Sequence, residues 1–144
     1  MAGEPIVLSV PLQSDLGRLA LELRRRVFVD EQRVPLDIER DEHDAAATHV
    51  VALLEGNVAG VMRIVFLPQH AKFGRVAVDR AYRRRGIAQA MMQFAMALAR
   101  ERGETRFYLT SQLDKVALYE KLGFIAFGER FEEGGLPHRA MKTY

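Results

Sequence analysis

The order of strand-forming and helix-forming segments constrains the fold of this 144-residue chain more than any other feature. Two β-rich runs, 49–54 and 58–67, flank the tripeptide Glu55-Gly56-Asn57, whose residues favour a tight turn and predict a β-hairpin. After residue 73 a strand, a long helix, a strand and a second helix follow one another. We therefore predict a mixed α/β domain in which an antiparallel meander leads into β-α-β crossovers.

The remaining segments are bounded by ordinary start and stop signals. Before the hairpin we expect a strand at 6–10 ended by Pro11, and a helix capped by Ser14 or Asp15 with Leu16, Leu19, Leu23 and Val27 at helical spacing. After the hairpin we expect a strand at 73–78, a helix at about 86–102 stopped by Gly103, a strand at 106–110, and a helix from 111 or 112 to 122 capped by Gly123. The closing strands are expected at 124–127 and 139–144, around Gly134-Gly135 and Pro137. No repeat or linker interrupts this order, so residues 1–144 are predicted to form one domain.

Composition excludes several classes of site. The chain contains no cysteine, which removes disulfides, thiolate metal sites and a cysteine nucleophile. Its four histidines lack clustered ligand spacing, so we expect no metal site. Residues 1–5 do not resemble a signal peptide, and no apolar run approaches the ~18 residues that span a bilayer. A cytoplasmic location without a membrane partner is the default expectation.

The charges are unevenly distributed although the formal net charge is only +2. Seven acids and two arginines between Asp30 and Asp44 give that stretch a net charge of −5, so the rest of the chain carries +7. Two arginine triplets, 24–26 and 83–85, belong to the basic part. The first is interpreted as a solvated helix face. Nucleic-acid binding by the triplets is disfavoured by the acidic stretch and by the absence of a nucleic-acid motif.

The segment 74–88 is where the chain carries recognisable chemistry. A strand leads through a polar loop into a helix, and the free N–H groups and dipole of a first helical turn bind anions. Gly86 allows close approach to the backbone, and three arginines precede it. These residues predict a phosphate or pyrophosphate site. A solvated basic loop with a packing glycine is the alternative, and the pattern is neither a P-loop nor a dinucleotide fingerprint.

Two motifs in register resemble those of the GNAT superfamily of N-acetyltransferases. Arg83-x-x-Gly86-x-Ala88, after the strand Val76-Ala77-Val78, matches the Q/R-x-x-G-x-G/A signature. Leu118-Tyr119-Glu120-Lys121-Leu122-Gly123-Phe124 is similar to the family's L-Y-x-x-x-G-F helix end. The segment 26–35, followed by the acidic run, further resembles the ElaA/YjcF-like branch. The element order fits the family over nearly the whole chain.

The resemblance implies the GNAT acyl-CoA N-acyltransferase fold, a central, mostly antiparallel sheet flanked by helices. It also implies acetyl-CoA as cosubstrate and direct attack of a primary amine in a ternary complex, without a covalent acyl-enzyme. In the family the strand backbone bonds the pantetheine arm and the loop amides hold the pyrophosphate. The cofactor-binding residues implied are Val76, Ala77, Val78, Arg83, Arg84, Arg85, Gly86, Ile87, Ala88 and Gln112.

Tyr119 occupies the position of the family's usual general acid, which protonates the CoA thiolate. The alternative is a core aromatic on an amphipathic helix. Two residues depart from the family pattern: Gln112 stands where asparagine is common, and Lys115 stands where a small residue is common. Gln112 can still reach a pantetheine amide, whereas Lys115 points to a CoA phosphate or marks an altered pocket.

A general base must deprotonate the acceptor amine before it attacks. Glu31 and Glu42 are the leading candidates, with His43 and His49 behind them, because the acidic stretch lies where the family places part of its acceptor site. The alternative for each residue is a solvated acidic loop. Taken together, the acids would attract a cationic amine.

The expected partner is a small-molecule or peptide amine. The resemblance also allows a homodimer, for which the sequence indicates no interface. A non-catalytic acyl-CoA-binding or sensing module, in which the cofactor cleft survives without an acceptor site, is the alternative function.

Overall fold

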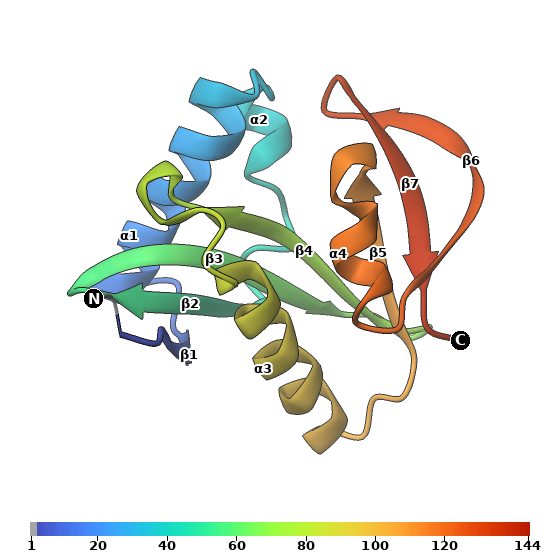
Figure 1. The fold of residues 1–144 in the computed structure, drawn as a ribbon, viewed down its shortest axis with the longest axis horizontal. Coiled ribbons are helices and arrows are strands. Elements are labelled where there is room, and N and C mark those ends of the chain that lie inside the picture. The colour runs from blue at the N-terminus through green and yellow to red at the C-terminus, as the bar shows by residue number, and fades with distance from the viewer. Residues whose placement is uncertain (1–2) are drawn as a thin grey trace.

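The computed structural model describes residues 3–144, which fold around one seven-stranded sheet (Figure 1). The strands are β1 (Ile6–Val10), β2 (Thr48–Leu54), β3 (Asn57–Phe66), β4 (Ala71–Val78), β5 (Phe107–Gln112), β6 (Ile125–Glu133) and β7 (Leu136–Lys142). Their spatial order is β1-β2-β3-β4-β5-β7-β6, and only the β4–β5 pair is parallel. The predicted mixed, mostly antiparallel sheet is therefore confirmed.

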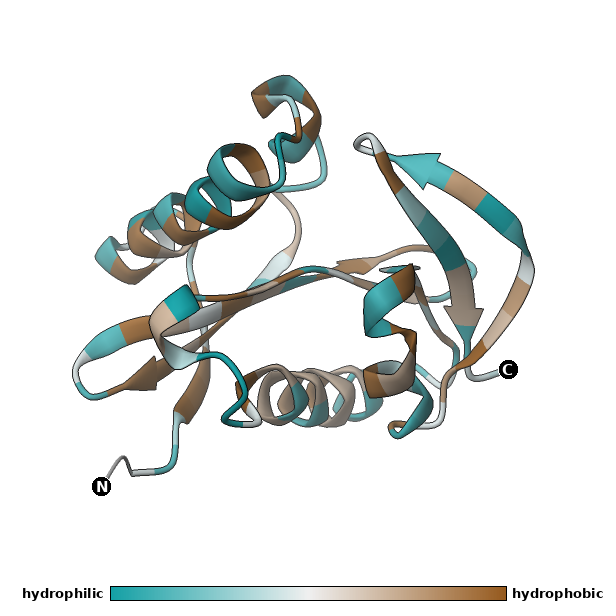
Figure 2. Cartoon of the chain, turned by 45° about the horizontal axis from the view of Figure 1, so that its top comes forward, coloured by the Kyte–Doolittle hydropathy of each residue, from teal (hydrophilic) through white to brown (hydrophobic). Residues whose placement is uncertain are grey.

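Helices cover both faces of the sheet (Figure 2). The helices are α1 (Asp15–Arg24), which continues as a π-helical segment (Arg25–Glu31), then α2 (Leu36–Glu39), α3 (Ile87–Glu101) and α4 (Val116–Glu120). Figures 1 and 2 place α3 on one face and α1 on the other. Each helix buries an apolar stripe in its own core cluster. Because both faces are covered, β2 and β3 are apolar almost throughout.

Close packing of α3 against β3 depends on Gly60. A Cβ at Gly60 would lie 2.8 Å from Cε of Met91 and 2.9 Å from Cγ2 of Ile87. A larger residue would force the side chains of Met91 and Ile87 to move. The apolar face predicted for this helix is confirmed, since Met91, Met92 and Ala95 are fully buried.

β4 and β5 separate part-way along their length. Their pairing ends at Phe73 and Leu109, so within residues 3–144 the following part of β4 has no strand paired with its β5-facing edge. On its other edge β4 pairs with β3 through a bulge, where Arg75 has a φ of +54°. A bulge bends its strand and increases its local twist. The separation leaves the β5-facing edge of residues 74–78 open.

The β2–β3 hairpin and the crossover through α3 form as predicted. The helix expected from residue 111 or 112 was wrong at its start, because β5 continues to Gln112 in register with β7 and a 3-10 turn (Leu113–Lys115) precedes α4. The closing strands are also longer than expected and meet at Gly134-Gly135, where both glycines have positive φ.

Candidate functional site

A cavity of about 430 Å³ opens where β4 and β5 separate. Both strands line it, together with the π-helical segment, α2, α4 and the β6–β7 hairpin. Three residues expected from the sequence, Val76, Gln112 and Tyr119, are brought together in this lining. Lys115 lines it too, so a charged side chain shares the cavity with Tyr119. Gln112 donates a hydrogen bond of 2.8 Å to Gln32.

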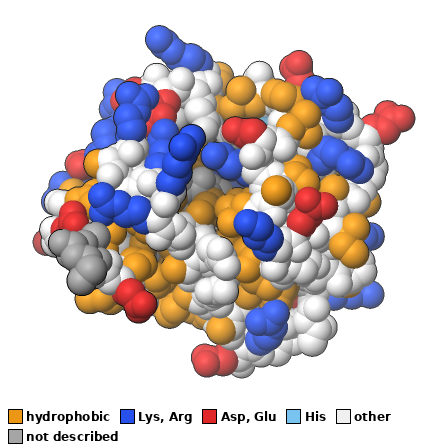
Figure 3. Space-filling view, viewed as in Figure 1, with side chains coloured by type: hydrophobic (Ala, Val, Ile, Leu, Met, Phe, Trp, Pro, Cys, Tyr) orange, Lys and Arg blue, Asp and Glu red, His pale blue; other side chains and the backbone are white. Residues whose placement is uncertain are grey.

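The loop before α3, where the sequence predicts an anion site, lies outside this cavity's lining. Gly86 is the N-cap of α3, with a φ of +75° and no side-chain cap, and a Cβ there would meet no atom within 4 Å. The first N–H groups of a helix have no intrahelical partner and lie at the positive end of its dipole, so those of α3 are free to bind an anion that reaches them beside Gly86. Figure 3 shows Lys and Arg side chains gathered where Figure 1 places this loop.

Arg83 holds this loop to its surroundings. Its Nε donates to the carbonyl oxygen of Val78 at 3.0 Å, and its Nη2 donates to Oε1 of Glu31 at 2.9 Å. Glu31 also lies 3.6 Å from Nη2 of Arg80. The structure therefore brings a base candidate, Glu31, to the arginines of the expected cofactor loop and outside the cavity lining.

The other expected residues take different positions. Glu42 is exposed and outside the lining, His43 lines the cavity, and the buried His49 lies 2.8 Å through Nε2 from the carbonyl oxygen of Asp44. Of the expected cofactor-binding residues, Ala77 and Ile87 are buried in the core, and Val78 and Ala88 are half-buried. Arg84 and Arg85 are exposed; Arg84 has a φ of +65°, and the guanidinium of Arg85 lies 3.7 Å from the carboxylate of Glu55.

Tyr119 presents a buried phenol to the cavity. Its side chain belongs to the core cluster and only 7% of the residue is exposed. Burial raises the pKa of Tyr119 above its ordinary value, because an anionic phenolate is poorly solvated there. The hydroxyl therefore stays protonated at neutral pH and is able to donate a proton.

Three acids of the 30–44 stretch lie in a cluster with three arginines, on the α1 and α2 side of the sheet. We call it the acid–arginine cluster; its members are Arg24, Arg63, Arg75, Glu39, Asp41 and Asp44. Arg24 is 1% exposed and donates to Oε2 of Glu39 at 2.6 Å and to Oδ1 of Asp44 at 2.8 Å. The interpretation of residues 24–26 as a solvated face was wrong for Arg24, because its side chain turns inward to these buried carboxylates.

The cluster neutralises three of the seven acids that had been expected to attract a cationic amine. Burial raises the pKa of Asp44, but the hydrogen bonds and charges of Arg24 and Arg63 more than offset this and hold it far below its ordinary value. Asp41 shows the same balance, with its pKa lowered by Arg63 and Arg75 against the effect of burial. Three positive charges thus balance three negative ones.

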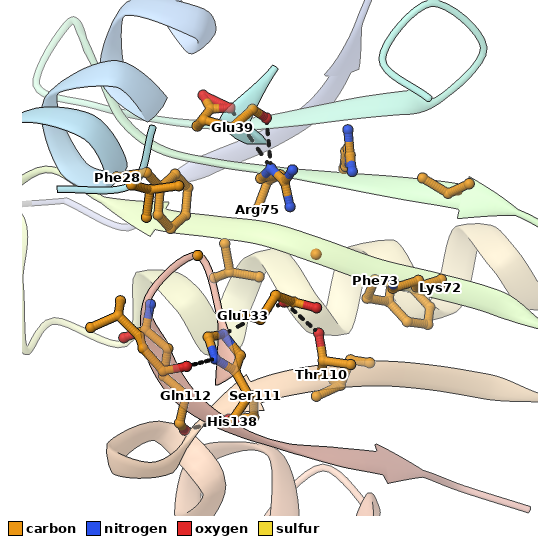
Figure 4. Close-up of a pocket in the computed structure, with 18 of the residues that line it drawn as sticks. Phe28, Glu39, Lys72, Phe73, Arg75, Thr110, Ser111, Gln112, Glu133 and His138 are labelled. Atoms are coloured by element: carbon orange, nitrogen blue, oxygen red, sulfur yellow. Dashed lines mark hydrogen bonds and ion pairs between the residues drawn. The ribbon is translucent and has the colours of Figure 1, made fainter. Parts of the chain in front are cut away.

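The sequence analysis missed a pair of titratable residues on the β6–β7 hairpin. His138 is buried, and its Nδ1 lies 2.8 Å from the carbonyl oxygen of Leu136 (Figure 4). A carbonyl only accepts hydrogen bonds, so Nδ1 carries a proton in this contact, and the neutral form of the ring has its lone pair at Nε2. Nε2 lies 3.6 Å from Oε2 of Glu133, which also accepts a hydrogen bond of 3.0 Å from Thr110.

Both residues of this pair line the cavity that contains Tyr119. The sequence predicts that the last strand begins at residue 139, after Pro137, whereas β7 begins at Leu136 and pairs His138 with Gln112 of β5. The register of β7 against β5 was the missing information, and no local motif marks it.

Comparison with known proteins now decides the family. The model of the Acetyltransferase (GNAT) family matches residues 18–124. This chain belongs to the GNAT acetyltransferase family. The uncharacterized N-acetyltransferase YjcF of Bacillus subtilis is 30% identical to it over 123 residues, which cover 85% of this chain and 88% of YjcF.

Solved structures of GNAT proteins agree. An acyl-CoA N-acyltransferase from Pseudomonas aeruginosa is 28% identical with a TM-score of 0.85, and the match covers 97% of this chain and 99% of that one. Escherichia coli ElaA has the same fold, with a TM-score of 0.83 at 24% identity over 97% of this chain and 99% of ElaA. The resemblance to the branch that contains ElaA and YjcF is confirmed.

Within residues 3–144 no helix has the length and apolar character needed to cross a membrane. In the same part of the chain, no three His, Asp or Glu side chains gather in a way that would hold a metal ion.

Proposed function

We propose that this GNAT protein is an acetyl-CoA-dependent N-acetyltransferase that transfers the acetyl group to a primary amine by direct attack in a ternary complex. One observation carries the proposal: the open edge of β4 runs between the N-terminus of α3 and a cavity that holds a buried, protonated Tyr119. The edge offers backbone groups for an extended ligand, and the helix end offers N–H groups for an anion.

The residues present fit acetyl-CoA at two places. The empty space around Gly86 leaves room for a pyrophosphate against the amides of residues 84–88. The unpaired edge of residues 74–78 would hold the pantetheine arm as an added strand, and Gln112, at the carboxyl end of β5, lines the cavity. Acetyl-CoA, when bound, supplies the activated acetyl group as a thioester.

Tyr119 would serve as the general acid. Its protonated hydroxyl would donate to the sulfur of the leaving thiolate as the carbon–sulfur bond breaks. Burial raises the pKa of Tyr119, so the phenol is still protonated when the thiolate leaves.

His138 and Glu133 are the general-base pair we favour over Glu31 and Glu42. His138 Nε2 would accept the proton of the acceptor amine, and the Glu133 carboxylate would stabilise the resulting imidazolium. Glu31 is engaged with Arg83 and Arg80, and Glu42 is exposed outside the lining, so neither is as well placed to reach an amine in the cavity. We keep acetyl as the acyl group, residues 1–144 as one GNAT domain and a cytoplasmic location as parts of the proposal.

Two variants test the chemistry against the non-catalytic alternative. Thiol release from acetyl-CoA would be followed over a panel of amino acids, peptides and polyamines. Tyr119→Phe should lower kcat while the Kd of acetyl-CoA changes little, because only the hydroxyl is lost. If the protein binds acetyl-CoA but none of the tested amines causes thiol release, the non-catalytic binding module is favoured. An unchanged kcat in Tyr119→Phe would show that the tyrosine is structural.

A further inference from the structure

The charges that line the cavity reveal the chemical class of the acceptor. Within the acid–arginine cluster the charges balance, so the cluster leaves no free carboxylate for a cationic group. Outside it, the ionised side chains of the lining are two lysines, Lys72 and Lys115, and one carboxylate, Glu133. The carboxylate already has His138 and Thr110 as neighbours. The cavity therefore has an excess of positive charge.

Two of the cations belong to β4, on the wall that Figure 4 draws apart from Glu133 and His138. Lys72 follows the alternation of the strand: Phe73 is buried in the α3 core, so its neighbour Lys72 points to the opposite face of the sheet, where it lines the cavity. Within residues 3–144 the ammonium of Lys72 pairs with no carboxylate, and its nearest aromatic contact is the ring of Tyr108 at 6.0 Å. A half-buried lysine without a counter-ion is available to an anion.

Arg75 adds a hydrogen-bond donor whose positive charge is already balanced by Glu39 and Asp41. Its Nε and Nη2 donate to the carbonyl oxygens of Glu39 and Ile38, and Nη2 also reaches Asp41 at 3.1 Å. These bonds fix the guanidinium at the cavity wall and leave Nη1 unengaged within residues 3–144. Burial is the main cause that lowers the pKa of Arg75; the charges of Arg63 and Arg24 act in the same direction, and those of Asp41 and Glu39 oppose them.

We infer that the acceptor is a primary amine that also carries an anionic group, a carboxylate or a phosphate, held by Lys72 and Arg75. The inference rests on the proposed acetyl transfer. It assigns the two ends of the acceptor to facing walls: the anionic group to the β4 cations, and the amine to His138. Apolar lining residues, among them Val65, Leu67 and Leu136, leave room for an uncharged side chain between them.

This class differs from the cationic amines that the acidic stretch had suggested. A polyamine would bring positive charge next to Lys72 and Arg75 and would find the acids already paired. An amino acid presents its carboxylate to the lysine instead, and a charge-assisted hydrogen bond favours binding by ~10- to 100-fold.

The test measures initial rates of thiol release for matched amines with wild-type protein saturated with acetyl-CoA. The amines are leucine, leucine amide and isoamylamine, then O-phosphoethanolamine and ethanolamine, then spermidine. We expect leucine or O-phosphoethanolamine to exceed its uncharged counterpart by ~10-fold or more in kcat/KM. The two pairs distinguish a carboxylate from a phosphate.

Lys72→Gln supplies the second measurement, and Lys121→Gln, an exposed lysine outside the lining, is its control. Lys72→Gln should raise KM for the anionic amine by ~10-fold or more while leaving kcat and the Kd of acetyl-CoA unchanged. Equal losses with anionic and neutral amines, or a preference for spermidine or the neutral counterparts, would overturn the inference. No release with any amine would overturn it as well.

A calorimetric titration with acetyl-CoA separates this failure from failure of the proposed function. Binding of acetyl-CoA with a preference for uncharged amines overturns only the acceptor class. Absence of acetyl-CoA binding overturns the proposed function and the inference with it.

Discussion

Arg24→Met is the substitution whose effect on stability follows most directly from the structure. Arg24 is 1% exposed, and its guanidinium donates to both carboxylate oxygens and the backbone oxygen of Glu39, besides Asp44. Without it, the Glu39 carboxylate, also 1% exposed, keeps only Arg75 at 3.7 Å. Asp44 still has Arg63 at 2.8 Å, so Glu39 is the group left without adequate compensation.

Breaking one side of a buried ion pair costs about 3–5 kcal/mol. Natural domains of this size are stable by roughly 5–15 kcal/mol, so Arg24→Met should remove a large part of the free energy of unfolding. Urea unfolding, followed by circular dichroism at pH 7, measures it. Arg25→Met is the matched control, because Arg25 is the exposed neighbour in the same triplet, and it should change stability by less than ~0.5 kcal/mol.

The double variant Arg24→Met with Glu39→Gln sharpens the test. If the cost arises from the stranded carboxylate, neutralising Glu39 should recover part of the lost stability, and the two substitutions should be strongly non-additive. The reasoning is refuted if Arg24→Met costs no more than Arg25→Met, or if the double variant shows simple additivity.

Three further outcomes are expected. The pKa of Asp44 is lowered in the folded state, so the stability that this carboxylate contributes is present above the unfolded pKa of 3.8 and is lost as the pH falls through the lowered folded value. In urea unfolding at pH 7 and pH 3, the free energy of unfolding should therefore fall less with acid in Asp44→Asn than in the wild-type protein. His138→Gln should lower kcat/KM by roughly 10²-fold while the Kd of acetyl-CoA stays constant, and an unchanged rate would exclude His138 as the base. Gly86→Ala should weaken the binding of acetyl-CoA measured by calorimetry, because the added Cβ would occupy space that the ligand needs. Gly103→Ala, also at positive φ with open surroundings, should leave the affinity unchanged. Equal affinities in the two variants would place the cofactor elsewhere.

The parts of the site that sequence reasoning could place are the ones encoded locally. The loop around Gly86 combines a positive φ, a helix start and neighbouring arginines within a few residues, so its backbone geometry follows from adjacent sequence. Tyr119 sits in a helix-end motif that is likewise continuous. The strand and helix order was predictable for the same reason, since periodicity and turn residues are local signals.

The parts that could not be placed depend on contacts between distant segments. Arg24 reaches Glu39 because α2 packs against the π-helical segment that continues α1, and nothing in an arginine triplet tells which of its members turns inward. His138 meets Glu133 through the register of the β6–β7 hairpin, which a bulge between Phe127 and Phe131 alters. The 3-10 turn after Gln112 was not predicted for a similar reason, because pairing with the distant strand β7 extends β5 to Gln112.

Calorimetric titration of the wild-type protein with acetyl-CoA tests the central claim, that the open β4 edge and the N-terminus of α3 form an acyl-CoA site. The account predicts saturable binding at one site per chain, with a Kd well below about 1 mM. The absence of any binding heat up to about 1 mM, together with no protection against thermal unfolding at that concentration, would contradict it.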